Sequence, residues 1–146
     1  MANVDAPNGA KPVRHLTGGV IRAREWKIIG DGNASSNIFT GDFVKLQSSG
    51  YITVAAAGNR LLGVFAGCKY TASDGTPKFA KYWPASTTTL GSADATAYVY
   101  DDPNIVFAIQ GDGTDAFTQV GNLANIVATA GSTTTGQSKM ELDTDN

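Results

Sequence analysis

The chain is poor in the side chains that most often carry out chemistry. Its 146 residues include one cysteine, Cys68, and one histidine, His15. A single cysteine excludes an intramolecular disulfide framework and an all-cysteine metal site. A Ser-His or Cys-His mechanism would have to use His15, which lies in a segment that we expect to be an extended arm and not part of a rigid scaffold. We therefore expect no catalytic triad.

Charged residues are also scarce, at 16% of the chain, and only two of them are glutamates. An average domain has about 25% charged residues, and helices usually carry Glu, Lys and Arg on their wet faces. Threonine, serine, glycine and asparagine are abundant instead, which is typical of strands and turns. No apolar run reaches the ~18 residues of a membrane span, and residues 1–19 lack the apolar centre of a signal peptide. We expect a soluble protein, made in the cytoplasm, with no membrane partner.

The net charge of −2 is small but unevenly distributed. Residues 1–27 hold five basic against two acidic side chains, and residues 101–146 hold seven acidic against one basic. An overall acidic balance gives no attraction to phosphate backbones, so nucleic acid is not an expected partner. The basic head and the acidic tail could meet between neighbouring copies of the chain, bind a third surface, or be ordinary solvated charge.

The apolar pattern predicts an all-β fold. Residues 1–19 contain two prolines and three glycines without a sustained apolar period, so we interpret them as an extended N-terminal arm. Residues 20–146 then form one β domain, a small antiparallel barrel or sandwich with a loop-rich C-terminal segment. Short apolar and aromatic runs lie at 20–29, 43–46, 51–55, 61–70, 79–83, 97–100 and 105–110.

Turn residues separate these runs. Ser48-Ser49-Gly50 is the strongest hairpin signal, and Asp74-Gly75 is the second. Asp101, Asp102 and Pro103 are assigned a turn-forming role, because proline fixes φ and Asp side chains bind nearby backbone amides. Residues 120–129 could form a short helix or a strand around residues 126–127.

Other chemical signals are incomplete. Adjacent Asp101 and Asp102 point in opposite directions on a strand and do not flank a glycosidic bond from two sides. Asp112-Gly113-Thr114-Asp115 resembles a fragment of a calcium loop but lacks the alternating oxygen ligands and the terminal bidentate glutamate. No glycine-rich phosphate loop follows a strand and opens a helix. We expect no enzyme activity, no metal and no cofactor.

Three aromatic residues are candidate interface positions: Trp26, Tyr82 and Trp83. Lys81-Tyr82-Trp83-Pro84 would place one aromatic side chain on each face of a strand, so one face is either wet or covered by a partner. The same residues could instead fill the core, or stack on sugars as in a carbohydrate-binding module. That module is the alternative function that composition leaves open.

Several stretches of the chain, taken together, are similar to one family of structural proteins. They are 6–19 (APNGAKPVRHLTGG), 41–46 (GDFVKL), 62–70 (LGVFAGCKY), 82–85 (YWPA), 101–110 and 122–142. In order and spacing they resemble the small head decoration, or cement, proteins of tailed bacteriophages. None of them is a catalytic signature.

This resemblance implies a virion structural protein on the outer surface of the assembled capsid. It would hold neighbouring major capsid subunits together against internal DNA pressure, with the major capsid protein and further copies of itself as partners. A homotrimer is favoured over a homodimer. The arm would bind the capsid, with Arg14 offered to a carboxylate and apolar anchors from Val13 and Leu16. The predicted capsid-binding residues are Pro12, Val13, Arg14, His15 and Leu16.

Overall fold

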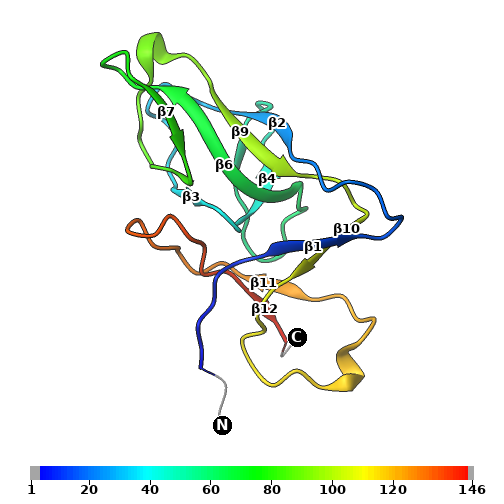
Figure 1. Ribbon diagram of the computed structural model, residues 1–146. Coiled ribbons are helices and arrows are strands. Elements are labelled where there is room, and N and C mark those ends of the chain that lie inside the picture. Colours follow the sequence, from blue (N-terminus) through cyan, green and yellow to red (C-terminus); the bar gives the residue numbers. More distant parts are fainter. Residues whose placement is uncertain (1–3, 145–146) are drawn as a thin grey trace.

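The computed structural model describes residues 4–144, and short β-strands dominate it (Figure 1). The prediction of an all-β chain is confirmed. Two short 3-10 helices, η1 (Leu90–Ser92) and η2 (Phe117–Gln119), lie between strands. The strands are β1 (Lys11–His15), β2 (Arg24–Ile28), β3 (Ile38–Phe39), β4 (Phe43–Leu46), β5 (Ile52–Val54), β6 (Gly63–Thr71), β7 (Pro77–Ala80), β8 (Tyr82–Trp83), β9 (Ala95–Tyr100), β10 (Ile105–Ala108), β11 (Asn125–Val127) and β12 (Glu141–Asp143).

A six-stranded antiparallel sheet forms the body of the molecule. Its order is β2-β9-β6-β4-β5, and β7 pairs with β6. The long strand β6 binds β9 along one edge and β4 and β7 along the other. The edge strands β2 and β5 contact each other, so the sheet curls, but the described strands do not close into a hydrogen-bonded barrel. Three two-stranded sheets complete the fold: β1-β10, β3-β8 and β11-β12.

Both predicted hairpins are present. Gly50 closes the β4–β5 turn by donating its N–H to the Gln47 carbonyl (3.0 Å), with φ at +86°, which favours glycine. Asp74 stabilises the β6–β7 turn, where its carboxylate accepts the Thr76 N–H at 2.9 Å. These turns were predictable because their chemistry is local to a few residues.

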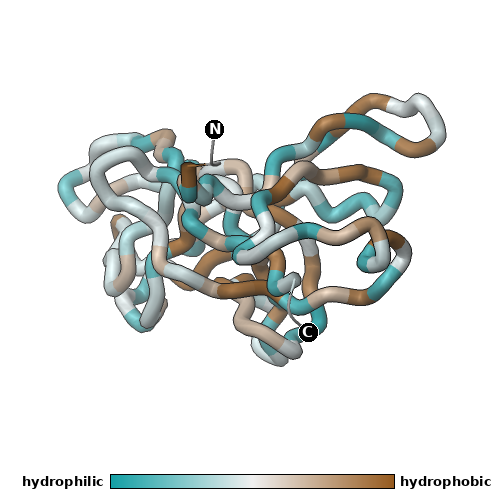
Figure 2. The backbone as a smooth tube through the Cα atoms, turned by 90° about the horizontal axis from the view of Figure 1, so that it is seen from below, coloured by the Kyte–Doolittle hydropathy of each residue, from teal (hydrophilic) through white to brown (hydrophobic). Residues whose placement is uncertain are grey.

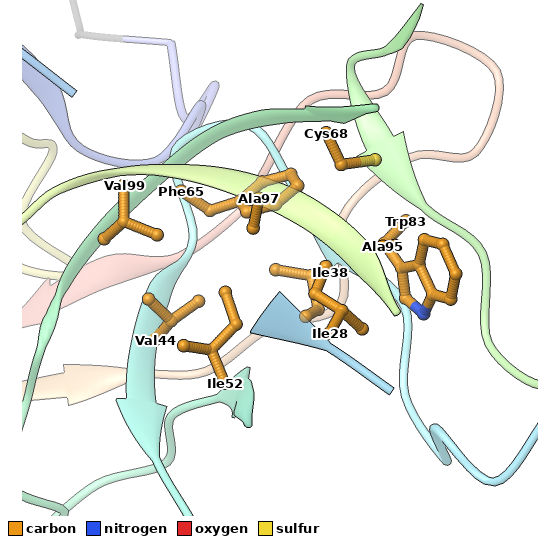
Figure 3. Packing of buried hydrophobic residues seen from close by; sticks show 10 residues of the cluster. All are labelled: Ile28, Ile38, Val44, Ile52, Phe65, Cys68, Trp83, Ala95, Ala97 and Val99. Atoms are coloured by element: carbon orange, nitrogen blue, oxygen red, sulfur yellow. The ribbon is translucent and has the colours of Figure 1, made fainter. Parts of the chain in front are cut away.

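The core lies inside the curled sheet, against β3 and β8. Figure 3 shows ten side chains of this cluster, and Figure 2 shows hydrophobic positions along the backbone both in the middle of the molecule and in its outer loops. Alternate residues of β9 point inward, as expected for a strand with one face on a core. On β6 the inward residues Phe65 and Cys68 are three positions apart, because the register shifts between Phe65 and Gly67. The cluster comprises Ile28, Ile38, Val44, Ile52, Phe65, Cys68, Trp83, Ala95, Ala97 and Val99. Burial raises the pKa of the Cys68 thiol to about 12, so this thiol is a packing group.

Trp83 corrects one interpretation of the aromatic residues. Its side chain is completely buried and lies edge-on to Tyr70, with ring centroids 5.0 Å apart. It therefore belongs to the core and is not available to a partner or to a sugar. The alternation in residues 81–84 correctly predicted that Tyr82 and Trp83 lie on opposite faces of the strand. It could not predict which face is buried, because the residues that pack on that face come from strands β6 and β3, elsewhere in the chain.

The C-terminal part carries little regular structure. Of the two alternatives for residues 120–129, the structure has the strand, β11, which pairs with β12. A second, smaller cluster joins this part to the body: Met140, Ile126 and Ala55 are buried together, with Phe43 and Val54 packed against them.

Candidate functional site

The N-terminal arm is extended, but part of it is a strand of the fold. Residues Lys11–His15 form β1 and pair antiparallel with β10, with an irregularity in register between Pro12 and Arg14. Just before the strand, Ala10 is buried and donates its N–H to the Gly41 carbonyl at 2.9 Å. The expected boundary between an arm at 1–19 and a separate body is therefore revised, because residues 9–15 are attached to the body.

The outer edge of β1 is open. Within residues 4–144, β1 pairs only with β10, so a further strand could bind its exposed backbone groups. Of the predicted capsid-binding residues, Val13, Arg14 and Leu16 are exposed, with Val13 at 56% and Leu16 at 61%. Pro12 is half-buried opposite Phe107. The structure thus brings two apolar side chains and one guanidinium to a single open strand edge and its end.

His15 has an internal role that the sequence did not predict. Its side chain is only 9% exposed, and its Nε2 lies 3.0 Å from the Asp102 carboxylate. Its Nδ1 accepts hydrogen bonds from the Thr17 hydroxyl (2.9 Å) and from the N–H groups of Thr17 and Gly19 (both 3.3 Å). These partners fit the tautomer with the proton on Nε2. His15 therefore fixes the end of β1 to the β9–β10 turn and is a positioning residue instead of a free contact.

The turn between β9 and β10 supports β1 and β2 together. Asp102 binds the Asn104 N–H through Oδ1 at 2.8 Å, and its carbonyl accepts the Ile105 N–H at 3.1 Å. Asp101 is directed elsewhere. Its nearly buried carboxylate accepts the Arg24 Nε–H at 2.8 Å and the Trp26 indole N–H at 3.0 Å. Asp102 thus stabilises the turn. The two carboxylates together tie the turn to two strands that lie 75 to 87 residues away in sequence.

The candidate interface aromatics do not share one exposed surface. Trp26 is half-buried against the core, and its only polar group is used by Asp101. Tyr82 is half-buried and stacks on Phe39, with centroids 5.3 Å apart. With Trp83 in the core, these three residues do not form the flat platform that sugar stacking needs.

The pKa values of Asp102 and Asp42 are shifted in opposite directions, so the two carboxylates should affect the pH dependence of stability in opposite ways. The Asn104 N–H, and next His15, lower the pKa of Asp102 below its usual value. The stability that Asp102 contributes is therefore present above about pH 4 and is lost as the pH falls through the lowered pKa. Burial instead raises the pKa of Asp42, whose Oδ2 accepts the Phe39 N–H at 2.8 Å. Its contribution is present at low pH and is lost as the pH rises through the raised pKa.

We expect Asp102→Asn to destabilise the protein near neutral pH and to have less effect in acid. Asp42→Asn should do the reverse, with its most favourable effect relative to wild type near neutral pH. Denaturant unfolding followed across acid to neutral pH measures both. Parallel curves for wild type and either variant would contradict the assignment of that carboxylate.

Sequence reasoning missed a second exposed surface, in the loop between β10 and β11. Phe117, Val120 and Leu123 are 90%, 74% and 96% exposed, which is unusual for three large apolar side chains within seven residues. In the sequence, these three apolar residues follow neither the spacing of a helix nor that of a strand, so no pattern marked them as a surface. Nearby, the Asp112 carboxylate accepts the Thr144 N–H at 3.0 Å, so Asp112 is engaged in a backbone contact.

Within residues 4–144, no cluster of three or more His, Cys, Asp or Glu side chains is placed to hold a metal ion. No helix in this part of the chain is long and apolar enough to cross a membrane. Comparison with protein-family models, with curated proteins and with solved structures finds no significant match to this chain.

Proposed function

We propose that this chain is a virion structural protein that binds the outer surface of an assembled phage capsid and cements neighbouring major capsid subunits. One observation carries the proposal: β1 presents an open strand edge with Val13, Arg14 and Leu16 exposed beside it, while His15 and Asp102 hold it in place. The resemblance of the arm and of five further stretches to head decoration proteins points to the same partner.

The geometry of β1 suits adhesion to a protein surface. An open edge can bind an extended segment of a capsid subunit through backbone hydrogen bonds. Arg14 can bind a carboxylate with two parallel hydrogen bonds, and Val13 and Leu16 can fill apolar pockets beside it. Because β1 is already fixed on β10, little backbone entropy is lost on binding.

In this proposal the body of the molecule carries β1, and assembly of several copies strengthens binding. The curled sheet, whose edge strands β2 and β5 meet, acts as a small barrel-like block that carries β1. Several copies, a homotrimer in preference to a homodimer, would grip several capsid sites at once, which raises avidity by about 10² to 10⁴ over one site. The proposed role needs no catalytic step, cofactor or nucleic acid, and it places the protein on the virion surface after synthesis in the host cytoplasm.

The test is co-sedimentation of the purified chain with undecorated capsids. Wild type should pellet with the capsids, and Arg14→Glu and Val13→Asp should each weaken binding about tenfold to a hundredfold, the effect of losing a charged hydrogen bond or a buried anchor. Arg60→Glu is the matched control, because Arg60 is an exposed cation outside β1. Failure of the wild-type chain to pellet, or equal loss in the control, would contradict the proposal.

A further inference from the structure

The loop between β10 and β11 carries an apolar and acidic surface, which we call the acidic patch: Phe117, Val120 and Leu123 with Asp115. All four side chains are exposed. No lysine, arginine or histidine occurs between Lys81 and Lys139, so the loop contains no cation to neutralise Asp115. Large exposed apolar side chains that lie close together in the sequence are typical of a binding surface.

The acidic patch is held in its exposed position. Gln119 accepts the Ala116 N–H through its side-chain oxygen at 2.7 Å and donates its amide to the Thr144 carbonyl beyond β12. Backbone bonds from Val120 to Phe117 (3.2 Å) and from Asn122 to Gln119 (3.0 Å) close the turn. These hydrogen bonds fix the shape of the loop that carries the exposed apolar side chains.

A hollow of about 230 Å³ lies between this loop and β12. Val120, Leu123 and Leu142 give it apolar walls, and Asp115 lies at its lining. Apolar walls next to a carboxylate fit a long cationic side chain, whose stem packs on the walls while its head binds the acid. The chemistry of the hollow therefore favours a partner that offers an apolar residue and an arginine or lysine together.

The same chain offers such a surface in the connection from β1 to β2, which we call the basic patch: Val20 and Arg22. Val20 is 71% exposed and Arg22 is exposed, and Arg22 makes no ion pair within residues 4–144. In Figure 1 the two patches lie on separate projecting segments, the blue connection after β1 and the yellow-to-orange loop around residue 120. Neither patch covers the other within one copy.

We propose that the acidic patch of one copy binds the basic patch of a second copy, with Arg22 at Asp115 and Val20 against the exposed apolar side chains. Because the same chain carries both patches, and they are complementary in charge and both apolar, the partner that binds the acidic patch is a second copy of the chain. The contact is head-to-tail, and each copy can make it twice, so copies join into a ring or a chain. This inference rests on the proposed function in one respect: it names the surface through which copies of the chain assemble before they bind several capsid sites at once.

Sedimentation velocity of purified protein, without capsids, tests the contact. Wild type should sediment as a species larger than a monomer. Leu123→Asn, which removes an apolar wall of the acidic patch without adding charge, and Arg22→Glu, which damages only the basic patch, should each be monomeric. An equal mixture of the two variants should form a dimer, because one intact patch of each kind remains. Phe79→Ser, which removes an equally exposed apolar side chain elsewhere, should assemble as wild type does.

A monomeric wild type, or a mixture of the two variants that stays monomeric, would overturn the inference. Both substitutions are at exposed positions, and thermal melting of each variant checks that the fold is intact. Capsid co-sedimentation separates this inference from the proposed function. If wild type assembles but does not pellet with capsids, the proposed function alone is overturned. If wild type is monomeric and pellets with capsids, the inference alone is overturned.

Discussion

Replacing Trp83 with alanine should remove a substantial part of the stability of the fold. Trp83 is completely buried where β8 meets the body, with Tyr70 edge-on to its ring. Truncating a buried tryptophan costs about 3 to 5 kcal/mol, because it loses transfer free energy and leaves a cavity. A domain of this size has a total free energy of unfolding of roughly 5 to 15 kcal/mol, so the loss is a substantial fraction of the total. Denaturant unfolding measures the difference.

Two further variants make this prediction specific. Trp83→Phe should cost less, because the indole N–H has no hydrogen-bond partner within residues 4–144 and its loss breaks no bond. Leu123→Ala, at a side chain that is 96% exposed, should change the free energy of unfolding little. A Trp83→Ala variant as stable as Leu123→Ala would show that the tryptophan is not a core residue.

Deletion of residues 1–16 should abolish capsid binding and also weaken the body. The deletion removes the open edge together with Val13, Arg14 and Leu16, so no part of the proposed contact remains. It also leaves β10 without a partner strand and uncovers Ile105, which is 7% exposed in the complete chain. The six-stranded sheet contains no residue of the deleted segment, so we expect a folded but less stable domain.

Circular dichroism and capsid co-sedimentation of the truncated chain test these two effects separately. If the truncated chain does not fold, the full-length variants Arg14→Glu and Val13→Asp decide the binding role, because both positions are exposed. A folded truncated chain that binds capsids as tightly as wild type would show that the adhesive surface lies elsewhere.

The features that the sequence predicted correctly depend on short-range chemistry. Gly50 and Asp74 mark their turns through contacts with residues at most three positions away. Apolar runs with turn residues between them were sufficient to predict an all-β chain.

The features that were missed depend on contacts between distant parts of the chain. Lys11 pairs with Ala108, and no local pattern in residues 1–19 identifies a partner almost a hundred residues away. Likewise, His15 was predicted to contact the capsid, but its hydrogen bond to Asp102 makes it a residue that positions β1. For Trp83, alternation gave the two faces of the strand but not the one that the fold covers.

The most direct test of the account is an image of decorated capsids at side-chain resolution. We expect the protein on the outer surface of the shell, with Val13 and Arg14 of β1 against a major capsid subunit and the curled sheet facing outward. A shell without bound protein, or protein attached by another face with β1 exposed to solvent, would contradict it.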